Sequence, residues 1–357
     1  MKYFFSLTSS SMLRRKLFLL ALLTPLVLCT GCVDEEYPSR DTPHDNFESL
    51  WRLMDEHYCF FSYKQEQTGV DWDEVHERYA QRIHPSMSRL QLFEVLSEML
   101  GELRDGHVNL STSFDLGRNW SYRENYARNY DASLIEDYLG NANDYHYASS
   151  LRYRLLDDNT GYVRCESFED GIGTGNLSVM LDLLKDANGI IIDVRDNGGG
   201  SMDDARKLAA CFTNQRILIG YTYHKTGKRH DAFSQPKAEY LDPAKGVRWQ
   251  KPVVVLTNRS VFSAANDFVS CMKQMPQTIV LGDTTGGGSG MPFKQELPSG
   301  WSVRYSAVVF LDGTKQHTEF GIAPDICASL DSTDLRQHHD TFIEMARRLI
   351  KNKTESK

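Results

Sequence analysis

Residues 253 to 267 read Val-Val-Val-Leu-Thr-Asn-Arg-Ser-Val-Phe-Ser-Ala-Ala-Asn-Asp. The first five are apolar or β-branched and predict a short buried strand over Val253 to Thr257. Polar residues at 258 to 260 end that run, and the pattern that follows predicts a helix from Ala264 to Met275. A buried strand that turns directly into a helix is the repeating unit of α/β folds. This stretch therefore predicts an α/β protein with a mostly parallel sheet.

Ser263 is placed by this pattern at the N-terminus of the helix. Backbone N–H groups and the helix dipole favour negative charge there, which is what a serine needs to attack a carbonyl group. An ordinary N-cap serine explains the same position, because serine is a preferred cap residue. Both interpretations stay open at this point.

Strands and helices alternate on either side of this unit. We expect an α/β core over 151–330, followed by a C-terminal helix and tail over 331–357. The expected strands cover 161–168, 189–194, 216–223, 278–281 and 301–311, and the expected helices cover 176–186, 203–212 and 334–350.

The region before the core has a different pattern. Apolar residues at helical spacing predict a small helical domain over 45–113, with its helices between 45 and 104. Ser88 and Gln91 form a capping box that predicts a helix start near Arg89. Residues 114–150 lack sustained periodicity and are interpreted as a connecting excursion.

The N-terminus is typical of an exported protein. Arg14, Arg15 and Lys16 precede the apolar run Leu17 to Leu28, which predicts a signal peptide over 1–31. Its ending resembles a lipobox, with Cys32 as the expected lipidation site and residues 32–44 as a tether. We expect a cell-envelope, outer-membrane lipoprotein that contacts the membrane through its lipid.

Charge and composition exclude other classes. Removing the four basic residues of the first 31 from the total of 40 leaves 36 basic against 48 acidic residues, so nucleic acid is not an expected partner. Neither a metal-ligand spacing nor a nucleotide motif is present, and no metal or cofactor is expected.

Three further motifs carry polar groups suited to catalysis. Asp105-Gly106-His107 lies where the helical pattern ends, and histidine is the usual general base near neutral pH. Residues 190–200, Ile-Ile-Ile-Asp-Val-Arg-Asp-Asn-Gly-Gly-Gly, run from a strand into a glycine loop that could present N–H groups to an oxyanion. Glu319 precedes Gly321-Ile322-Ala323-Pro324-Asp325 and offers a carboxylate. Each motif alone also fits a plain turn, an ordinary histidine or a strand exit.

As a set, in this order, these motifs resemble the peptidase family that includes tricorn protease, the C-terminal-processing proteases and the interphotoreceptor retinoid-binding modules. The resemblance covers roughly residues 45 to 330. It implies a crotonase-like α/β core with Ser263 as nucleophile, His107 as base and Glu319 as the group that supports the base. It also implies an oxyanion hole from the backbone of Ala264 and a glycine of the 198–200 loop, for which we take Gly199.

The sequence departs from the family pattern at several positions. Gly287 stands where the processing proteases carry a lysine base, which favours the tricorn-like histidine arrangement. Gly106 replaces the serine that precedes the tricorn histidine, and Glu319 lies two residues before Gly321 where relatives have it three before. The excursion over 114–150 is too short for the PDZ module common in the family.

The resemblance therefore implies a serine-type endopeptidase or tail-processing peptidase that acts on polypeptides or peptides. The Asn and Tyr residues between 119 and 145 and the loop 286–290 are candidates for substrate contact, with a plain solvated loop as the alternative for any one of them. With His107 as base, activity should rise with pH through about 6 to 7, the range of an ordinary histidine. The alternative is a family member without turnover that binds an apolar or peptide ligand. The oligomeric state does not follow from the sequence.

Overall fold

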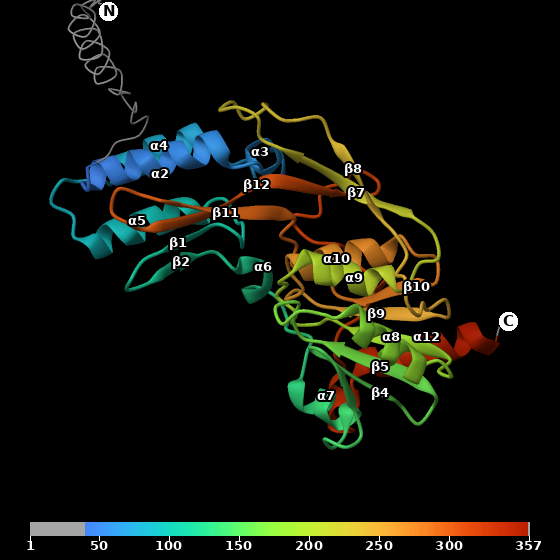
Figure 1. Cartoon of the computed structure of the whole chain (residues 1–357). Coiled ribbons are helices and arrows are strands. Elements are labelled where there is room, and N and C mark those ends of the chain that lie inside the picture. Colours follow the sequence, from blue (N-terminus) through green and yellow to red (C-terminus); the bar gives the residue numbers. More distant parts are fainter. Residues whose placement is uncertain (1–39, 356–357) are drawn as a thin grey trace, which may run out of the picture. The chain divides into compact units, whose positions relative to one another are not determined.

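The computed structural model describes residues 40 to 355, which belong to one compact unit built around two β-sheets (Figure 1). The helical region, the excursion and the α/β core thus lie in the same unit rather than in separate ones. The expected signal peptide, Cys32 and the tether up to residue 39 lie outside the described residues.

The larger sheet has the strand order β13-β10-β9-β6-β5-β4-β3. Strands β5, β6, β9, β10 and β13 are parallel, and β4 and β3 continue the sheet in antiparallel pairing. All residues of β5, β6 and β9 are buried, as parallel strands covered on both faces should be. The predicted mostly parallel α/β core is confirmed. The strands are β3 His146–Ala148, β4 Leu151–Leu155, β5 Thr160–Cys165, β6 Gly189–Asp193, β9 Val253–Thr257, β10 Thr278–Gly282 and β13 Ile326–Cys327.

Helices cover both faces of this sheet because alternate side chains of each strand point in opposite directions. Val253 and Val255 pack with α8 (Thr174–Leu183), α9 (Met202–Ala210) and α10 (Ala264–Lys273). Val254 and Leu256 instead pack with α12 (Thr341–Glu355) and α7 (Ala132–Leu139). The helix expected from Ala264 is therefore held firmly against the sheet at its N-terminal end.

The second sheet is antiparallel and has the order β2-β1-β12-β7-β8, with β11 also paired to β12. It contains the segment expected at 216–223, which is β7 and lies outside the parallel sheet. Its strands are β1 Asn109–Ser111, β2 Leu116–Arg118, β7 Ile217–His224, β8 Lys237–Leu241, β11 Gly290–Glu296 and β12 Ser302–Asp312.

The N-terminal helices pack on this second sheet and share its core (Figure 1). Phe47 and Leu96 belong to the same apolar cluster as Val303 and Val309 of β12. The helical region therefore has no separate hydrophobic core. Its core is shared with β12, a strand that lies about 200 residues later in the sequence. The predicted capping box of Ser88 and Gln91 is present at the start of α5. The helices are α2 Pro43–His57, α3 Phe61–Thr68, α4 Trp72–Ala80 and α5 Arg89–Gly101.

The C-terminal segment contains two helices, so the single helix expected over 334–350 is wrong. The helix α11 spans Ser332–Arg336 and α12 begins at Thr341. His338 adopts a positive φ of 55° between them, a conformation that interrupts a helix. Asp340 then caps α12 by accepting hydrogen bonds from the N–H groups of Phe342 and Ile343.

The segment 114–150 holds only short elements. They are β2, α6 (Ser121–Glu124), α7 and β3. Ile135 and Leu139 of α7 are fully buried against the larger sheet. The segment thus runs from the second sheet to the first and is anchored at both.

Candidate active site

Ser263 is the residue immediately before α10, at the end of the loop that connects β9 to this helix. Its φ of 57° and ψ of −123° are a conformation that residues other than glycine rarely adopt. Its side chain makes no capping hydrogen bond, so the interpretation as an ordinary N-cap serine does not hold. The backbone N–H of Ser263 donates to the carbonyl oxygen of Gly287 at 2.9 Å. The hydroxyl is left to a partner outside the helix.

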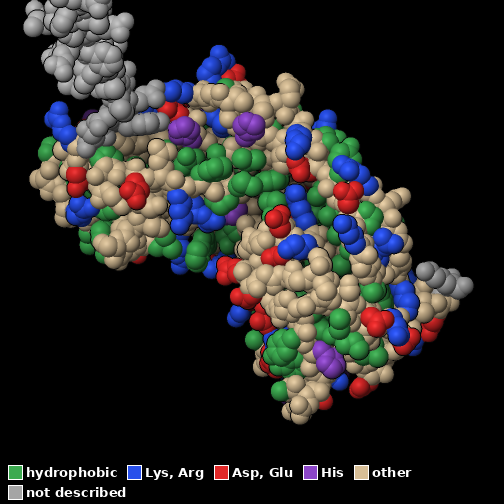
Figure 2. All heavy atoms as spheres, viewed as in Figure 1, with side chains coloured by type: hydrophobic (Ala, Val, Ile, Leu, Met, Phe, Trp, Pro, Cys, Tyr) green, Lys and Arg blue, Asp and Glu red, His purple; other side chains and the backbone are tan. Residues whose placement is uncertain are grey.

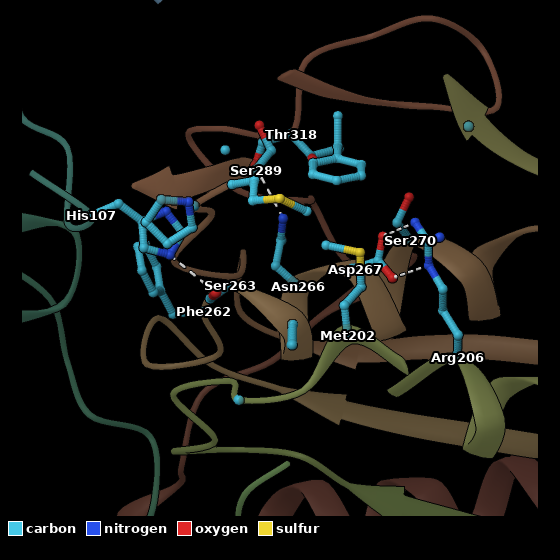
Figure 3. Close-up of a pocket in the computed structure, with 18 of the residues that line it drawn as sticks. His107, Met202, Arg206, Phe262, Ser263, Asn266, Asp267, Ser270, Ser289 and Thr318 are labelled. Atoms are coloured by element: carbon cyan, nitrogen blue, oxygen red, sulfur yellow. Dashed lines mark hydrogen bonds and ion pairs between the residues drawn. The ribbon is translucent and has the colours of Figure 1, made fainter. Parts of the chain in front are cut away.

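That partner is His107. Its Nε2 lies 3.0 Å from the Ser263 Oγ, although 156 residues separate the two in the sequence (Figure 3). Asp105 fixes the loop that carries the histidine, since its Oδ1 accepts the N–H of His107 at 2.7 Å. Its Oδ2 accepts the hydroxyl of Tyr58 at 2.8 Å. The structure therefore brings together two of the predicted site residues and adds Asp105 and Tyr58 behind them.

Burial controls the charge of His107, whose side chain is almost wholly enclosed. Desolvation lowers its pKa to about 4, and the positive charges of Arg304 and Lys64 act in the same direction. The carboxylate of Asp105 opposes them. The ring is therefore neutral at pH 7, and a neutral ring that accepts the serine proton at Nε2 carries its own proton on Nδ1. Within residues 40 to 355, nothing forms a hydrogen bond with that Nδ1.

Glu319 is buried but does not contact the His107 ring through a hydrogen bond. Its Oε1 accepts from the Lys64 Nζ at 2.9 Å, and its Oε2 accepts from the N–H of Ser289 at 2.9 Å. Desolvation raises the pKa of Glu319 to about 7, Asp105 adds to this rise, and Lys64 and the Ser289 N–H oppose it. The structure thus places the predicted glutamate in the same buried cluster, with Lys64 as its direct partner.

Gly106 has a steric reason to be glycine. A Cβ atom at this position would lie 2.7 Å from a ring carbon of Tyr122 and 2.8 Å from one of Phe262. The Tyr122 and Phe262 rings are stacked, with centroids 4.4 Å apart. The two aromatic rings therefore fill the space that the serine of the tricorn arrangement would need.

Gly287 is equally constrained. Its φ is 87°, and a Cβ here would collide with the backbone of Glu319. A lysine at this position would require the chain to move. The carbonyl oxygen of Gly287 accepts the hydrogen bond from the backbone N–H of Ser263.

The glycine loop lies directly beside the serine. A Cβ on Gly199 would come within 2.8 Å of the Ser263 Cβ and 3.0 Å of the Ala264 nitrogen. However, the Gly199 N–H donates to Asn197 Oδ1 at 2.9 Å, so this conformation does not offer it to a ligand. Gly198 and Gly200 line the cavity next to Ser263. The N–H of Ala264 is in the first turn of α10, where no preceding helical carbonyl can accept it.

A cavity of about 470 Å³ opens from Ser263 and His107. Figure 3 shows His107 at one end and the ion pair between Arg206 and Asp267 at the other, where the Arg206 Nε lies 3.0 Å from the Asp267 Oδ2. The lining also includes the apolar side chains of Met202, Ile219, Met291 and Phe310. The cavity thus combines the polar groups of the serine and histidine with an apolar lining.

A serine with a strained backbone at a helix N-terminus, held against a buried neutral histidine, is the arrangement of a serine hydrolase. Residues 159–328 match peptidase family S41, and residues 39–101 match the tricorn protease C1 domain. A crystal structure of a protein assigned as a peptidase, from Parabacteroides merdae ATCC 43184, is 48% identical, with a TM-score of 0.83 and coverage of 87% of this chain and 97% of that one. The chain belongs to peptidase family S41.

One more distant relative is similar in sequence, and one further structure shares the fold alone. The carboxy-terminal processing protease CtpA of Bacillus subtilis (strain 168) is 28% identical over 180 residues, which are 49% of this chain and 36% of that protein. The chain therefore matches only about a third of the length of this curated relative. Mature CPAF complexed with lactacystin is 12% identical with a TM-score of 0.68, covering 88% of this chain and 99% of that one, and shares the fold.

Sequence reasoning missed Lys64, Tyr58 and Ser289, and quoted Asp105 without giving it a role. Lys64 lies in an unremarkable polar helix sequence, Phe-Ser-Tyr-Lys-Gln-Glu-Gln-Thr, and carried no signal of burial. Asp105 could have been found, because an Asp two residues before a histidine can accept that histidine's backbone N–H. No group of three or more residues able to hold a metal ion occurs between residues 40 and 355.

Proposed function

We propose that this protein is a serine-type peptidase that hydrolyses peptide bonds through an acyl-enzyme on Ser263. The observation that carries the proposal is the 3.0 Å contact between the free Ser263 hydroxyl and Nε2 of the neutral His107. A hydroxyl in contact with a neutral imidazole can lose its proton as it attacks.

The reaction proceeds in two halves. Ser263 Oγ attacks the carbonyl carbon of the scissile bond while its proton moves to His107 Nε2, which gives a tetrahedral oxyanion. The C–N bond then breaks, Nε2 returns the proton to the leaving amine, and an acyl ester remains on Ser263. A water molecule deprotonated by the same Nε2 hydrolyses the ester and regenerates the serine.

The oxyanion is stabilised by backbone N–H groups. Ala264 supplies one from the first turn of α10, with the helix dipole behind it. The glycine loop supplies the second. Because the Gly199 N–H is held by Asn197, its neighbours Gly198 and Gly200, which line the cavity, fit this role better. Glu319 does not orient the ring but supports the site indirectly, by accepting the N–H of Ser289 beside the segment that holds Ser263.

The substrate is a polypeptide or peptide, cut internally or near its C-terminal end. The family supports this class of substrate, and the apolar lining supports an apolar side chain next to the scissile bond. On the face shown in Figure 2, Lys and Arg side chains are interspersed with Asp and Glu, so no extended basic surface forms there.

The proposal is tested by labelling with a fluorophosphonate, which phosphonylates only activated serines. We expect a single adduct on Ser263, located by peptide mass spectrometry. Because burial lowers the pKa of His107 to about 4 and only the neutral ring accepts a proton, the labelling rate should rise with pH through about 4 and be flat above about 6. This differs from the range of 6 to 7 expected for an exposed histidine.

The same measurement can contradict the proposal. Absence of any adduct on folded wild-type protein at pH 7 would favour a member of the family without turnover. An adduct on Ser263 with a midpoint of 6 to 7 would keep the nucleophile but show that His107 is more solvated in solution than in the structure.

We further propose that the protein is an outer-membrane lipoprotein of the cell envelope, acylated at Cys32. The basic cluster, the apolar run and Cys32 support this location. Between residues 40 and 355, none of the helices has the length and apolar character needed to cross a membrane.

Cys32→Ser should release an exported, soluble protein, whereas the wild type should partition with membranes into detergent. The acylated cysteine is the only anchor in this proposal, so its removal should be sufficient. Cys29→Ser, three residues earlier, is the matched control and should remain with the membrane. A wild-type protein found entirely in the soluble envelope fraction would refute the anchor.

A further inference from the structure

Lys64 is an ammonium group with no access to solvent. It lies on α3 in the N-terminal helical region, and its side chain is 0% exposed. Its Nζ contacts Glu319 Oε1 at 2.9 Å and the carbonyl oxygen of Arg104 at 3.4 Å. It also lies 4.1 Å from the centroid of the Phe320 ring, a cation–π distance. The proposed chemical steps assign no role to this charge.

Stability alone is a poor explanation for such a pair. Taking both charges out of water carries a penalty that their attraction offsets only in part, and packed apolar side chains of similar volume would often serve the fold equally well. The pair also joins residues 255 positions apart in the sequence. A structural role predicts that an apolar replacement of both partners would be tolerated in every respect.

The contacts of Glu319 lead from Lys64 to the serine. Glu319 Oε2 accepts the N–H of Ser289, and its backbone carbonyl accepts the N–H of Gly288 at 3.0 Å. The adjacent Gly287 carbonyl accepts the N–H of Ser263. One short segment, 287–289, is therefore held by Glu319 on one side and holds the strained serine on the other.

The charges near the pair also act on the histidine. Lys64 and Arg304 favour the neutral ring of His107, and Asp105 favours the charged one. The same two residues also oppose each other at Glu319, where Asp105 raises the pKa of the carboxyl group and Lys64 lowers it. The other titratable groups that face this cluster are Tyr58, Cys59, Tyr63 and His317.

We propose that Lys64 is a positioning residue of the active site, which fixes Glu319 against the segment 287–289 and thereby holds Ser263 in place for attack. The inference rests on the proposed function, because it assigns Lys64 a part in that reaction. It makes the N-terminal helical region a component of the catalytic machinery. Lys64 does not line the cavity at Ser263, so its loss should leave substrate binding intact.

The test replaces Lys64 by methionine and measures fluorophosphonate labelling and peptide hydrolysis over a range of pH. Displacement of reacting groups by about 1 Å can reduce rates on the order of 10²-fold, and we expect kcat to fall by roughly that factor with KM little changed. Loss of the cation should also move the midpoint of the pH profile upward, because one charge that favours neutral His107 is gone. Lys64→Arg keeps the charge and should recover part of the rate and most of the midpoint.

Two further variants separate positioning from folding. Lys64→Met combined with Glu319→Gln removes both buried charges, so the double variant should unfold at nearly the wild-type denaturant concentration while its labelling stays slow. Lys273→Met is the matched control, since Lys273 pairs with Asp325 at 2.8 Å on the partly exposed side of α10 and should matter little. A folded double variant with the wild-type rate and pH midpoint would overturn the proposed role of Lys64 and leave the proposed function of the protein intact. A wild type that never labels would refute the proposed function and the inference with it.

Discussion

Ser263→Ala should abolish hydrolysis, and His107→Ala should reduce kcat almost as far. General-base catalysis typically contributes about 10² to 10⁴ in rate, and a nucleophile without its base remains protonated. Nucleophile and base act as one unit, so the double variant should be little slower than either single variant. Measurement of kcat and KM with a peptide substrate, in parallel with fluorophosphonate labelling, tests this expectation.

The control for Ser263 is Ser260→Ala. Ser260 belongs to the same connection between β9 and α10 but does not line the cavity, so its removal should leave kcat unchanged. Glu319→Gln should slow the reaction less than His107→Ala, because Glu319 acts on the site only indirectly, through its hydrogen bonds to the segment 287–289. If His107→Ala kept a rate within a few-fold of wild type while Ser263→Ala was inactive, the proton acceptor would be another group.

The position of Ser263 at the start of a helix could be predicted from the local pattern, whereas its pairing with His107 was implied only by the family resemblance. The β-branched run before Ser263 can hardly be anything but a buried strand, and the polar break after it forces the turn into α10. The distance between the two side chains was beyond reach of local pattern. That distance depends on the pairing of β12 with β1, the strand that follows His107. Local sequence pattern does not predict this pairing.

The partner of Glu319 could not be predicted, since Lys64 looks like an ordinary helix-surface lysine. Its burial follows from tertiary packing of α3 against the loop after β12, which periodicity in an eight-residue helix does not reveal. The position of β7 was missed for a related reason. Its apolar residues fit either sheet, and only pairing with β12 decides between them.

The break between α11 and α12 depends on a contact with a distant part of the chain, which the local sequence does not reveal. Asp340 lies between the two helices and is fully buried, and its side chain bonds to a residue far away in the sequence. Arg195, at the end of β6 and just before the glycine loop, donates from Nη1 to both carboxylate oxygens of Asp340, at 3.1 and 2.9 Å. Because Asp340 must lie beside the buried guanidinium of Arg195 and also caps α12, this ion pair determines where α12 begins.

Asp340→Ala should therefore destabilise the protein far more than the loss of a helix cap. Arg195 would keep only Asp193 as a carboxylate partner, bound at 2.9 and 2.6 Å, inside a site where all three side chains are 0% exposed. Removal of one partner from a buried ion pair typically costs about 3–5 kcal/mol of unfolding free energy. Urea unfolding followed by circular dichroism measures this change.

Two variants separate charge from capping in that experiment. Asp331→Ala removes the exposed cap of α11, which accepts from the N–H groups of Thr333 and Asp334, and should cost about 1 kcal/mol. Asp340→Asn keeps an oxygen that can cap α12 but removes the charge that Arg195 requires, so it should remain much closer to Asp340→Ala than to wild type. Because Arg195 leads directly into the glycine loop, Asp340→Asn should also slow labelling of Ser263 even where the fold persists. Equal losses for Asp331→Ala and Asp340→Ala would show that the buried pair contributes nothing beyond the cap.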